Sequence, residues 1–181
     1  LNISRETLQD SQILKRIGAV LTRRVLKFLE EESKRDKEKY EKFFREYAQF
    51  LKQGVCTDLK WKEDIAKLLR VESSKTVGSE MTSFEEYVDR MASNQQSIFY
   101  LCAPTRQLAE SSPYYEAFKS KGVEVLFLYS SIDDFVMTNL AEFKGKKCMS
   151  VESSQAAEQL KDIESRGDAE KTEDEKKDDS D

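Results

Sequence analysis

The sequence predicts an α/β domain with three layers, in which a small parallel sheet of about three strands follows a helical arm of three or four helices. Two observations predict this class. Up to about residue 95, apolar residues recur every three or four positions, which is the period of a helix with one buried face. From residue 97 onward, continuous apolar runs alternate with helical segments. Strands that alternate with helices pair in parallel and need helices on both faces of the sheet.

The helical arm is expected to contain one long helix and three shorter ones. The long helix has an apolar stripe from Leu14 to Phe28, while Lys and Arg occupy its other faces. Aromatic residues form the stripe of the second helix, where we expect them in the core, and Gly54 ends that helix. Thr82 and Glu85 form a capping box before the fourth helix. The arm is assigned to residues 1–95, with helices over 5–32, 40–54, 61–69 and 83–91 and a loop over 72–80.

The sheet unit is built from three apolar runs with a helix in each gap. Ser112 and Pro113 begin the first of these helices, which ends at Gly122. Ser131, with Asp134 three residues later, is the expected cap of the second helix. The unit is assigned to residues 96–152, with strands over 98–102, 123–129 and 147–151 and the second helix ending at residue 145.

Charge separates the C-terminal end from the rest of the chain. The net charge is -5 over 181 residues, and the stretch from Lys161 to Asp181 carries all of it. This stretch has almost no apolar residues, so residues 153–181 are expected to form a disordered acidic tail. The neutral body argues against a nucleic-acid partner, and the lack of a long apolar run argues against a membrane partner.

Composition excludes several classes of enzyme. The chain has no histidine, so Ser-His-Asp and Cys-His nucleophiles are impossible. Its three cysteines form no C-x-x-C pair, and we expect no metal site.

The carboxyl ends of the predicted strands are the usual ligand crevice of such a sheet. They read CAPTRQ and YSSIDD, without the glycines that let a backbone hold a phosphate. Asp133 and Asp134 could bind a divalent cation, but acids in a first helical turn are explained by the helix dipole. Arg106 is expected to be a solvated loop cation. A small ligand-binding domain that uses the crevice near Pro104, Ser130 and Asp133 stays open as an alternative.

The first nine residues, LNISRETLQ, contain the other candidate site. Asn2 and Ser4 are helix-capping types, which places Arg5 in the first turn, where the macrodipole disfavours a cation. Arg5 and Gln9 are four residues apart and so share one face. A guanidinium there can bind two phosphate oxygens, although an exposed, frayed terminus explains the same residues.

These nine residues and the SQILKRIGAVLTRR that follow resemble the catalytic loop and long helix in the middle domain of the ninety-kilodalton heat-shock chaperone family. The resemblance continues in order over roughly residues 1–152. Its blocks include EKYEKFFREYAQFLKQGV, IAKLLRVESS, MTSFEEYVDRM, SPYYEAFKSKGVEVLFL and LAEFKGKKCMSVE. The stretch LCAPTRQLAESSPYYEAFK is most similar to the mitochondrial, tumour-necrosis-factor-receptor-associated type.

The resemblance implies an ATPase chaperone whose nucleotide, ATP with Mg²⁺, is held mainly by an N-terminal domain outside this chain. Arg5 would contact the γ-phosphate, with Gln9 beside it and Asn2 supporting the loop. The implied partners are that ATPase domain, a C-terminal dimerisation domain and client proteins. The chain alone is expected to be a monomer that does not hydrolyse ATP, within a homodimeric parent. The mitochondrial matrix is the implied location, with the cytoplasm as the alternative, and a non-enzymatic interaction scaffold is a further alternative function.

Overall fold

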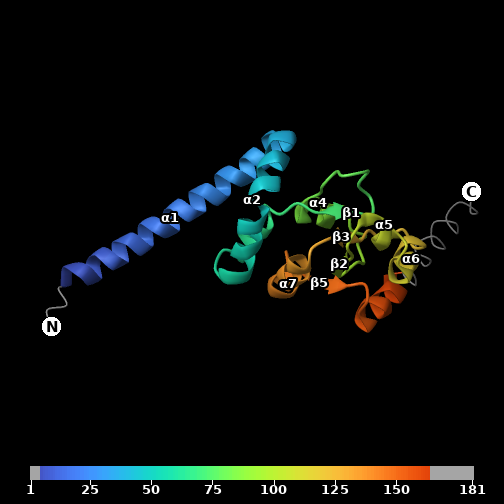
Figure 1. The fold of residues 1–181 in the computed structure, drawn as a ribbon. Helices are drawn as coiled ribbons and strands as arrows, with labels where there is room; N and C mark the ends of the chain where they lie inside the picture. The colour runs from blue at the N-terminus through green and yellow to red at the C-terminus, as the bar shows by residue number, and fades with distance from the viewer. Residues whose placement is uncertain (1–4, 164–181) are drawn as a thin grey trace, which may run out of the picture. The chain divides into compact units, whose positions relative to one another are not determined.

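The computed structural model describes the backbone of residues 5–163, and side chains from residue 12 onward (Figure 1). The chain divides into two compact units, residues 1–46 and residues 47–181. The division falls within the second helix, so the third and fourth helices of the expected arm belong to the second unit, together with the sheet.

The first unit contains helix α1 (Arg5–Arg35) and the beginning of α2 (Lys37–Thr57). Asp36 separates the two helices, and its carboxylate accepts a hydrogen bond from the backbone N–H of Lys39 at 3.0 Å, which starts α2. Tyr40 and Phe44 of α2 are buried, as the aromatic stripe predicted. Tyr47 and Phe50 of the same stripe are more than half exposed, so the expectation that they lie in the core is wrong for them.

The second unit is built on a five-stranded mixed sheet with the order β1-β3-β2-β5-β4. The three central strands, β3, β2 and β5, are parallel, which confirms the small parallel sheet. The two edge strands are antiparallel and only two residues long, too short to leave a pattern in the sequence. The strands are β1 (Glu72–Ser73), β2 (Ser97–Cys102), β3 (Leu126–Leu128), β4 (Glu142–Phe143) and β5 (Lys146–Ser150).

Helices lie on both faces of this sheet, as the parallel order requires. On one face, Phe99 of β2 meets Phe118 with ring centroids 4.8 Å apart, and Phe127 of β3 meets Tyr115 at 5.2 Å. Helix α7 contacts β2 and β5, and its residues Val136, Met137 and Leu140 are buried. Besides the end of α2 and a helix over residues 154–163, this unit contains α3 (Lys62–Ala66), α4 (Phe84–Asp89), α5 (Arg106–Glu110), α6 (Pro113–Lys119) and α7 (Ser131–Leu140).

Two predicted helix starts are wrong by one residue. The capping box of α4 pairs Ser83 with Glu86, where the sequence suggested Thr82 with Glu85. The box of α7 begins at Ser130 and closes on Asp133, one residue before the expected Ser131 and Asp134. Both runs offer adjacent residues able to cap, and the tertiary position of the first turn selects between them.

The predicted end of α7 and the predicted tail are also corrected. Helix α7 ends at Leu140, because residues 142–150 turn back as the β4–β5 hairpin, in which Lys144 and Gly145 take positive φ angles of 49° and 72°. Residues 154–163, expected to be disordered, form a helix instead. Ala156 and Leu160 of this helix are buried in the same cluster as Phe99 and Phe127, which supplies its stability. The remainder of the acidic tail lies outside the described residues.

Candidate functional site

Two of the predicted phosphate-binding residues, Arg5 and Gln9, belong to the first turns of α1. The helix begins at Arg5, as the capping residues in the sequence predicted, and Gln9 follows one turn later on the same helix. Asn2 lies outside the described residues, as do the side chains of Arg5 and Gln9. The roles of these three residues therefore stay predictions.

The crevice at the carboxyl ends of β2 and β3 is the second predicted site, and the structure contains a cavity there. Its volume is about 270 Å³. It includes the predicted Pro104 and Ser130, while Asp133 lies one turn into α7 beside it. The cavity is lined by Cys102, Ala103, Pro104, Leu128, Tyr129, Ser130 and Ser131.

The polar side chains around the crevice are engaged within the protein. Asp133 forms an ion pair with Lys52 of α2, at 2.5 Å, and accepts a hydrogen bond from the backbone N–H of Ser130 at 3.3 Å. The neighbouring Asp134 accepts a hydrogen bond from the hydroxyl of Tyr100 at 3.5 Å. Across the described part of the chain, no three potential ligands gather to hold a metal ion, so the geometry gives the acidic pair no support as a cation site.

Cys102 is the only side chain lining the crevice that has a nucleophilic sulfur atom, and its surroundings keep it protonated. Burial is the main cause that raises the pKa of the thiol to about 12, and the nearby carboxylates of Asp134 and Asp133 contribute to the same shift. The pKa of Tyr100 is raised to about 12 for the same two reasons. Because the thiolate is the reactive form of cysteine, Cys102 is not poised for nucleophilic chemistry at neutral pH.

Arg106 is not the solvated loop cation that the sequence suggested. Its guanidinium forms ion pairs with Glu72 at 3.1 Å and Glu110 at 2.7 Å, and it lies 5.5 Å from the ring centre of Phe127. It also donates hydrogen bonds to three backbone carbonyls, that of Ser73 at the end of β1 and those of Thr76 and Gly78 in the loop that follows. Arg106 therefore holds this loop against the start of α5. No local pattern in the sequence indicates this role, because the acceptors are backbone atoms some thirty positions away.

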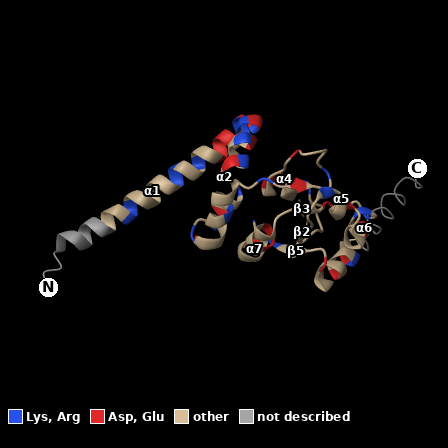
Figure 2. Ribbon diagram, viewed as in Figure 1, with Lys and Arg blue, Asp and Glu red and all other residues tan. Residues whose placement is uncertain are grey.

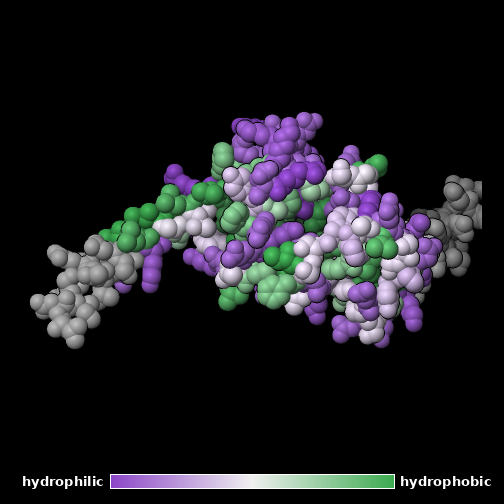
Figure 3. Space-filling model, in the orientation of Figure 1, coloured by the Kyte–Doolittle hydropathy of each residue, from purple (hydrophilic) through white to green (hydrophobic). Residues whose placement is uncertain are grey.

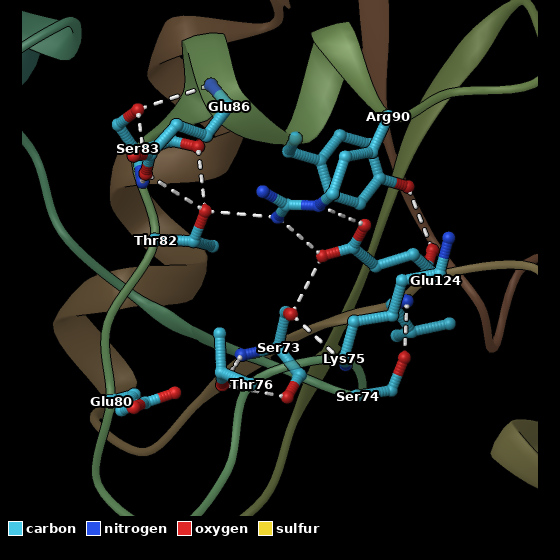
Figure 4. A network of polar contacts seen from close by, with 12 residues as sticks. Ser73, Ser74, Lys75, Thr76, Glu80, Thr82, Ser83, Glu86, Arg90 and Glu124 are labelled. Atoms are coloured by element: carbon cyan, nitrogen blue, oxygen red, sulfur yellow. Dashed lines mark hydrogen bonds and ion pairs between the residues drawn. The ribbon is translucent and has the colours of Figure 1, made fainter.

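A buried polar network at the opposite end of β3 was also missed (Figure 4). Arg90, which follows α4, donates to both carboxylate oxygens of Glu124, at 3.0 and 2.7 Å. Glu124 is 5% exposed, and it also accepts a hydrogen bond from the hydroxyl of Ser73 at 2.6 Å. Arg90 donates to Thr82 as well, at 2.9 Å. In the sequence, Glu124 merely interrupts an apolar run, which is the one signal that could have singled it out.

Tyr87 extends this network into the sheet. Its hydroxyl donates to the backbone carbonyl of Glu124 at 2.8 Å and accepts hydrogen bonds from the backbone of Phe99 and the side chain of Gln95, each at 3.0 Å. Burial raises the pKa of Tyr87 well above its ordinary value. The network ties α4, β1 and the strands together with its hydrogen bonds satisfied internally, so it is a structural element and not a ligand site.

None of the helices in the described part of the chain combines the length and the apolar character needed to span a bilayer.

Comparison with known proteins supplies what the described geometry does not. The Hsp90 protein family matches residues 1–180. The mitochondrial TNF receptor-associated protein 1 homolog of Dictyostelium discoideum is 48% identical over 163 residues, which cover 88% of this chain and 23% of the relative. The mitochondrial heat shock protein 75 kDa of Bos taurus is 46% identical over 164 residues, covering 90% of this chain and 23% of the relative.

A bacterial relative also matches most of this chain over a small part of its own length. The chaperone protein HtpG of Desulfitobacterium hafniense is 43% identical over 152 residues, which cover 84% of this chain and 25% of that protein. The chain thus spans about a quarter of the length of the relatives it matches. Since the family match extends over nearly every residue, the chain belongs to the Hsp90 protein family.

Proposed function

We propose that this chain is the middle-domain part of an ATP-dependent chaperone, and that it supplies Arg5 to an ATPase site held mainly by another domain of the same protein. The observation that carries the proposal is the family match over residues 1–180, which includes the LNISRETLQ segment. Two of the relatives matched over this stretch carry chaperone or heat-shock names.

The proposed chemistry is the stabilisation of negative charge. Hydrolysis of ATP spreads charge over the oxygens of the γ-phosphate, and a guanidinium placed against them lowers the barrier. Arg5 is the group proposed to do this, with Gln9 one turn further along α1 and Asn2 supporting the loop before it. The free N–H groups of a helix start also favour an anion at this position.

The nucleotide and its Mg²⁺ are assigned to the other domain. Mg²⁺ requires carboxylate or phosphate oxygens. In residues 12–163, whose side chains the structure describes, no group of three acidic, cysteine or histidine residues comes together to offer such a site. Bound ATP supplies the phosphoanhydride bond that is broken, and this chain contributes only the residues that face the γ-phosphate.

The proposal is tested in a chimera in which this chain replaces the matching stretch of the Dictyostelium relative. In this chimera, Arg5→Ala is expected to lower kcat for ATP hydrolysis by roughly 10²- to 10³-fold. The KM for ATP should change little, because the other domain holds the nucleotide. The measurement is steady-state phosphate release.

Arg45→Ala is the matched control, because Arg45 is an exposed arginine on α2, outside the proposed site. Equal kcat values for Arg5→Ala, Arg45→Ala and the unsubstituted chimera would contradict the proposal. The isolated chain should not bind ATP tightly, and it should not hydrolyse ATP. Tight binding of ATP to the isolated chain would favour the alternative of a small ligand-binding domain at the crevice.

The partners and the location are part of the same proposal. We infer that the whole protein is a homodimer that binds client proteins, with its dimerisation domain outside this chain. The names of two relatives place those proteins in mitochondria, which supports the mitochondrial matrix as the proposed location, with the cytoplasm as the alternative. A ligand site at the crevice of the strand ends is less favoured, since the carboxylates there are engaged within the protein. A purely scaffolding role is the other alternative, and equal kcat values for Arg5→Ala and the unsubstituted chimera would favour it.

A further inference from the structure

Helix α1 has a wide apolar face that its own unit leaves exposed. Between Ile13 and Phe28, seven large apolar side chains are each about half exposed or more. With 3.6 residues per turn, they fall within an arc of about 140°, over a length of about 22 Å. Figure 3 shows this face as a continuous apolar strip along α1. The seven residues are Ile13, Leu14, Ile17, Val20, Leu21, Val25 and Phe28, which we call the α1 stripe.

One long edge of the α1 stripe is positively charged. Arg16 and Lys27 lie beside that edge, and Arg24 lies within the arc on the same side. Residues 12–29 contain no Asp or Glu at all (Figure 2). The stripe also leads into a cavity of about 130 Å³ where α1 and α2 meet, lined in part by Phe28 and Tyr40. A partner that fits this surface has an apolar ridge, an apolar side chain for the cavity and acidic residues along one edge.

Three possible occupants fit this chemistry poorly. The acidic residues 164–181 of this chain contain Ala169 as their one apolar residue, so they cannot cover the stripe. A second copy would bring an acid-free cationic surface against another one. A membrane-surface helix carries cations along both sides of its apolar face, whereas here they favour one edge, and three glutamates, residues 30–32, follow directly.

We infer that the α1 stripe is a permanent interface, covered by another folded part of the same polypeptide that presents an apolar ridge edged by Asp or Glu. A contiguous stripe of seven large apolar residues is typical of permanent interfaces and not of transient ones. The relatives have about three quarters of their length outside the stretch that this chain matches, so they contain ample chain to supply such a part. The inference rests on the exposure and charge of α1, and is independent of the role proposed for Arg5.

Cysteine labelling tests the inference. Leu21→Cys places a thiol in the middle of the stripe, and Lys15→Cys places one on another, exposed face of α1 as the matched control. In the 181-residue chain, both thiols should react with a maleimide at similar rates. In the chimera with the Dictyostelium relative, Leu21→Cys should react at least about tenfold more slowly, while Lys15→Cys keeps its rate. Peptide mass mapping separates these sites from the native cysteines, and Val25→Cys repeats the test if Leu21→Cys does not fold.

Four outcomes would overturn the inference. Equal labelling of both sites in the chimera would show that the stripe stays uncovered. Protection of Leu21→Cys in the 181-residue chain would show that the chain covers the stripe itself, and protection that rises with concentration would indicate a second copy. If Leu21→Cys in the 181-residue chain is protected from the maleimide only when anionic lipid vesicles are added, the stripe binds a membrane surface. If the chimera does not fold, the same pair of thiols at the aligned positions of the Dictyostelium relative decides the question.

Discussion

Glu124 and Arg90 form the most consequential pair of residues in the sheet unit. Glu124 is almost fully buried, whereas the side chain of Arg90 is 36% exposed. The buried carboxylate therefore needs its ion-pair partner more than the arginine does, because water can still solvate the guanidinium. Hydrogen bonding to Glu124 raises the pKa of the Arg90 guanidinium, opposed in part by burial. The arginine therefore stays charged, and Glu124 has a permanent counterion.

Arg90→Met should strongly destabilise the protein. The substitution leaves a buried carboxylate without its cation, which costs about 3 kcal/mol of unfolding free energy. Lys119→Met is the control, because Lys119 is exposed on α6, and its replacement should change stability by less than about 0.5 kcal/mol. Urea unfolding followed by circular dichroism measures both. Similar midpoints for the two variants would show that the network in Figure 4 contributes little.

The first residue of a helix depends on the tertiary structure where two neighbouring residues can both act as the cap. Ser130 and Ser131 are adjacent and chemically identical, yet the structure uses Ser130 to cap α7, with the Asp133 carboxylate accepting from the Ser130 backbone N–H. The helix that begins there buries Val136 and Leu140 against the sheet.

Replacing each serine in turn distinguishes the two positions. Ser130→Ala should lower the unfolding free energy by about 1 kcal/mol, because the first turn of α7 loses its side-chain acceptor. Ser131→Ala should be close to neutral, since Ser131 is exposed and lies within the helix. Thermal unfolding of the two variants side by side is the measurement. A larger loss of unfolding free energy for Ser131→Ala than for Ser130→Ala would show that Ser131 is the cap of α7, as the sequence suggested.

The molecule as a whole should lose stability at alkaline pH. Burial raises the pKa of Cys102 and of Cys148 to about 12, against an ordinary value of 9.0. These thiols ionise more readily in the unfolded chain, so their contribution is complete below pH 9 and is lost as the pH rises toward 12. The slope is at most about 1.4 kcal/mol per pH unit for each thiol.

Urea unfolding between pH 8 and pH 10.5 measures this loss. The double variant Cys102→Ala, Cys148→Ala should show a shallower fall in stability with pH, although its stability at pH 8 is lower because two partly buried side chains are truncated. Tyr87 and Tyr100, whose pKa values are also raised by burial, keep some pH dependence in the variant. An unchanged slope would show that the thiols do not take part.

The sequence by itself determined the helical period before residue 95, the three parallel strands, the start of α1 at Arg5 and, through its motifs, the family. These features depend on neighbours along the chain, where periodicity, capping residues and contiguous motifs act. Only the tertiary structure decided the two edge strands, the role of Arg106, the Arg90–Glu124 pair and the helix over residues 154–163. Each of these is stabilised by partners distant in sequence: Arg106 binds carbonyls about thirty positions away, and Leu160 becomes helical by packing beside Phe99. Such pairings have no local signature, because the free energy that favours them exists only once the sheet has formed.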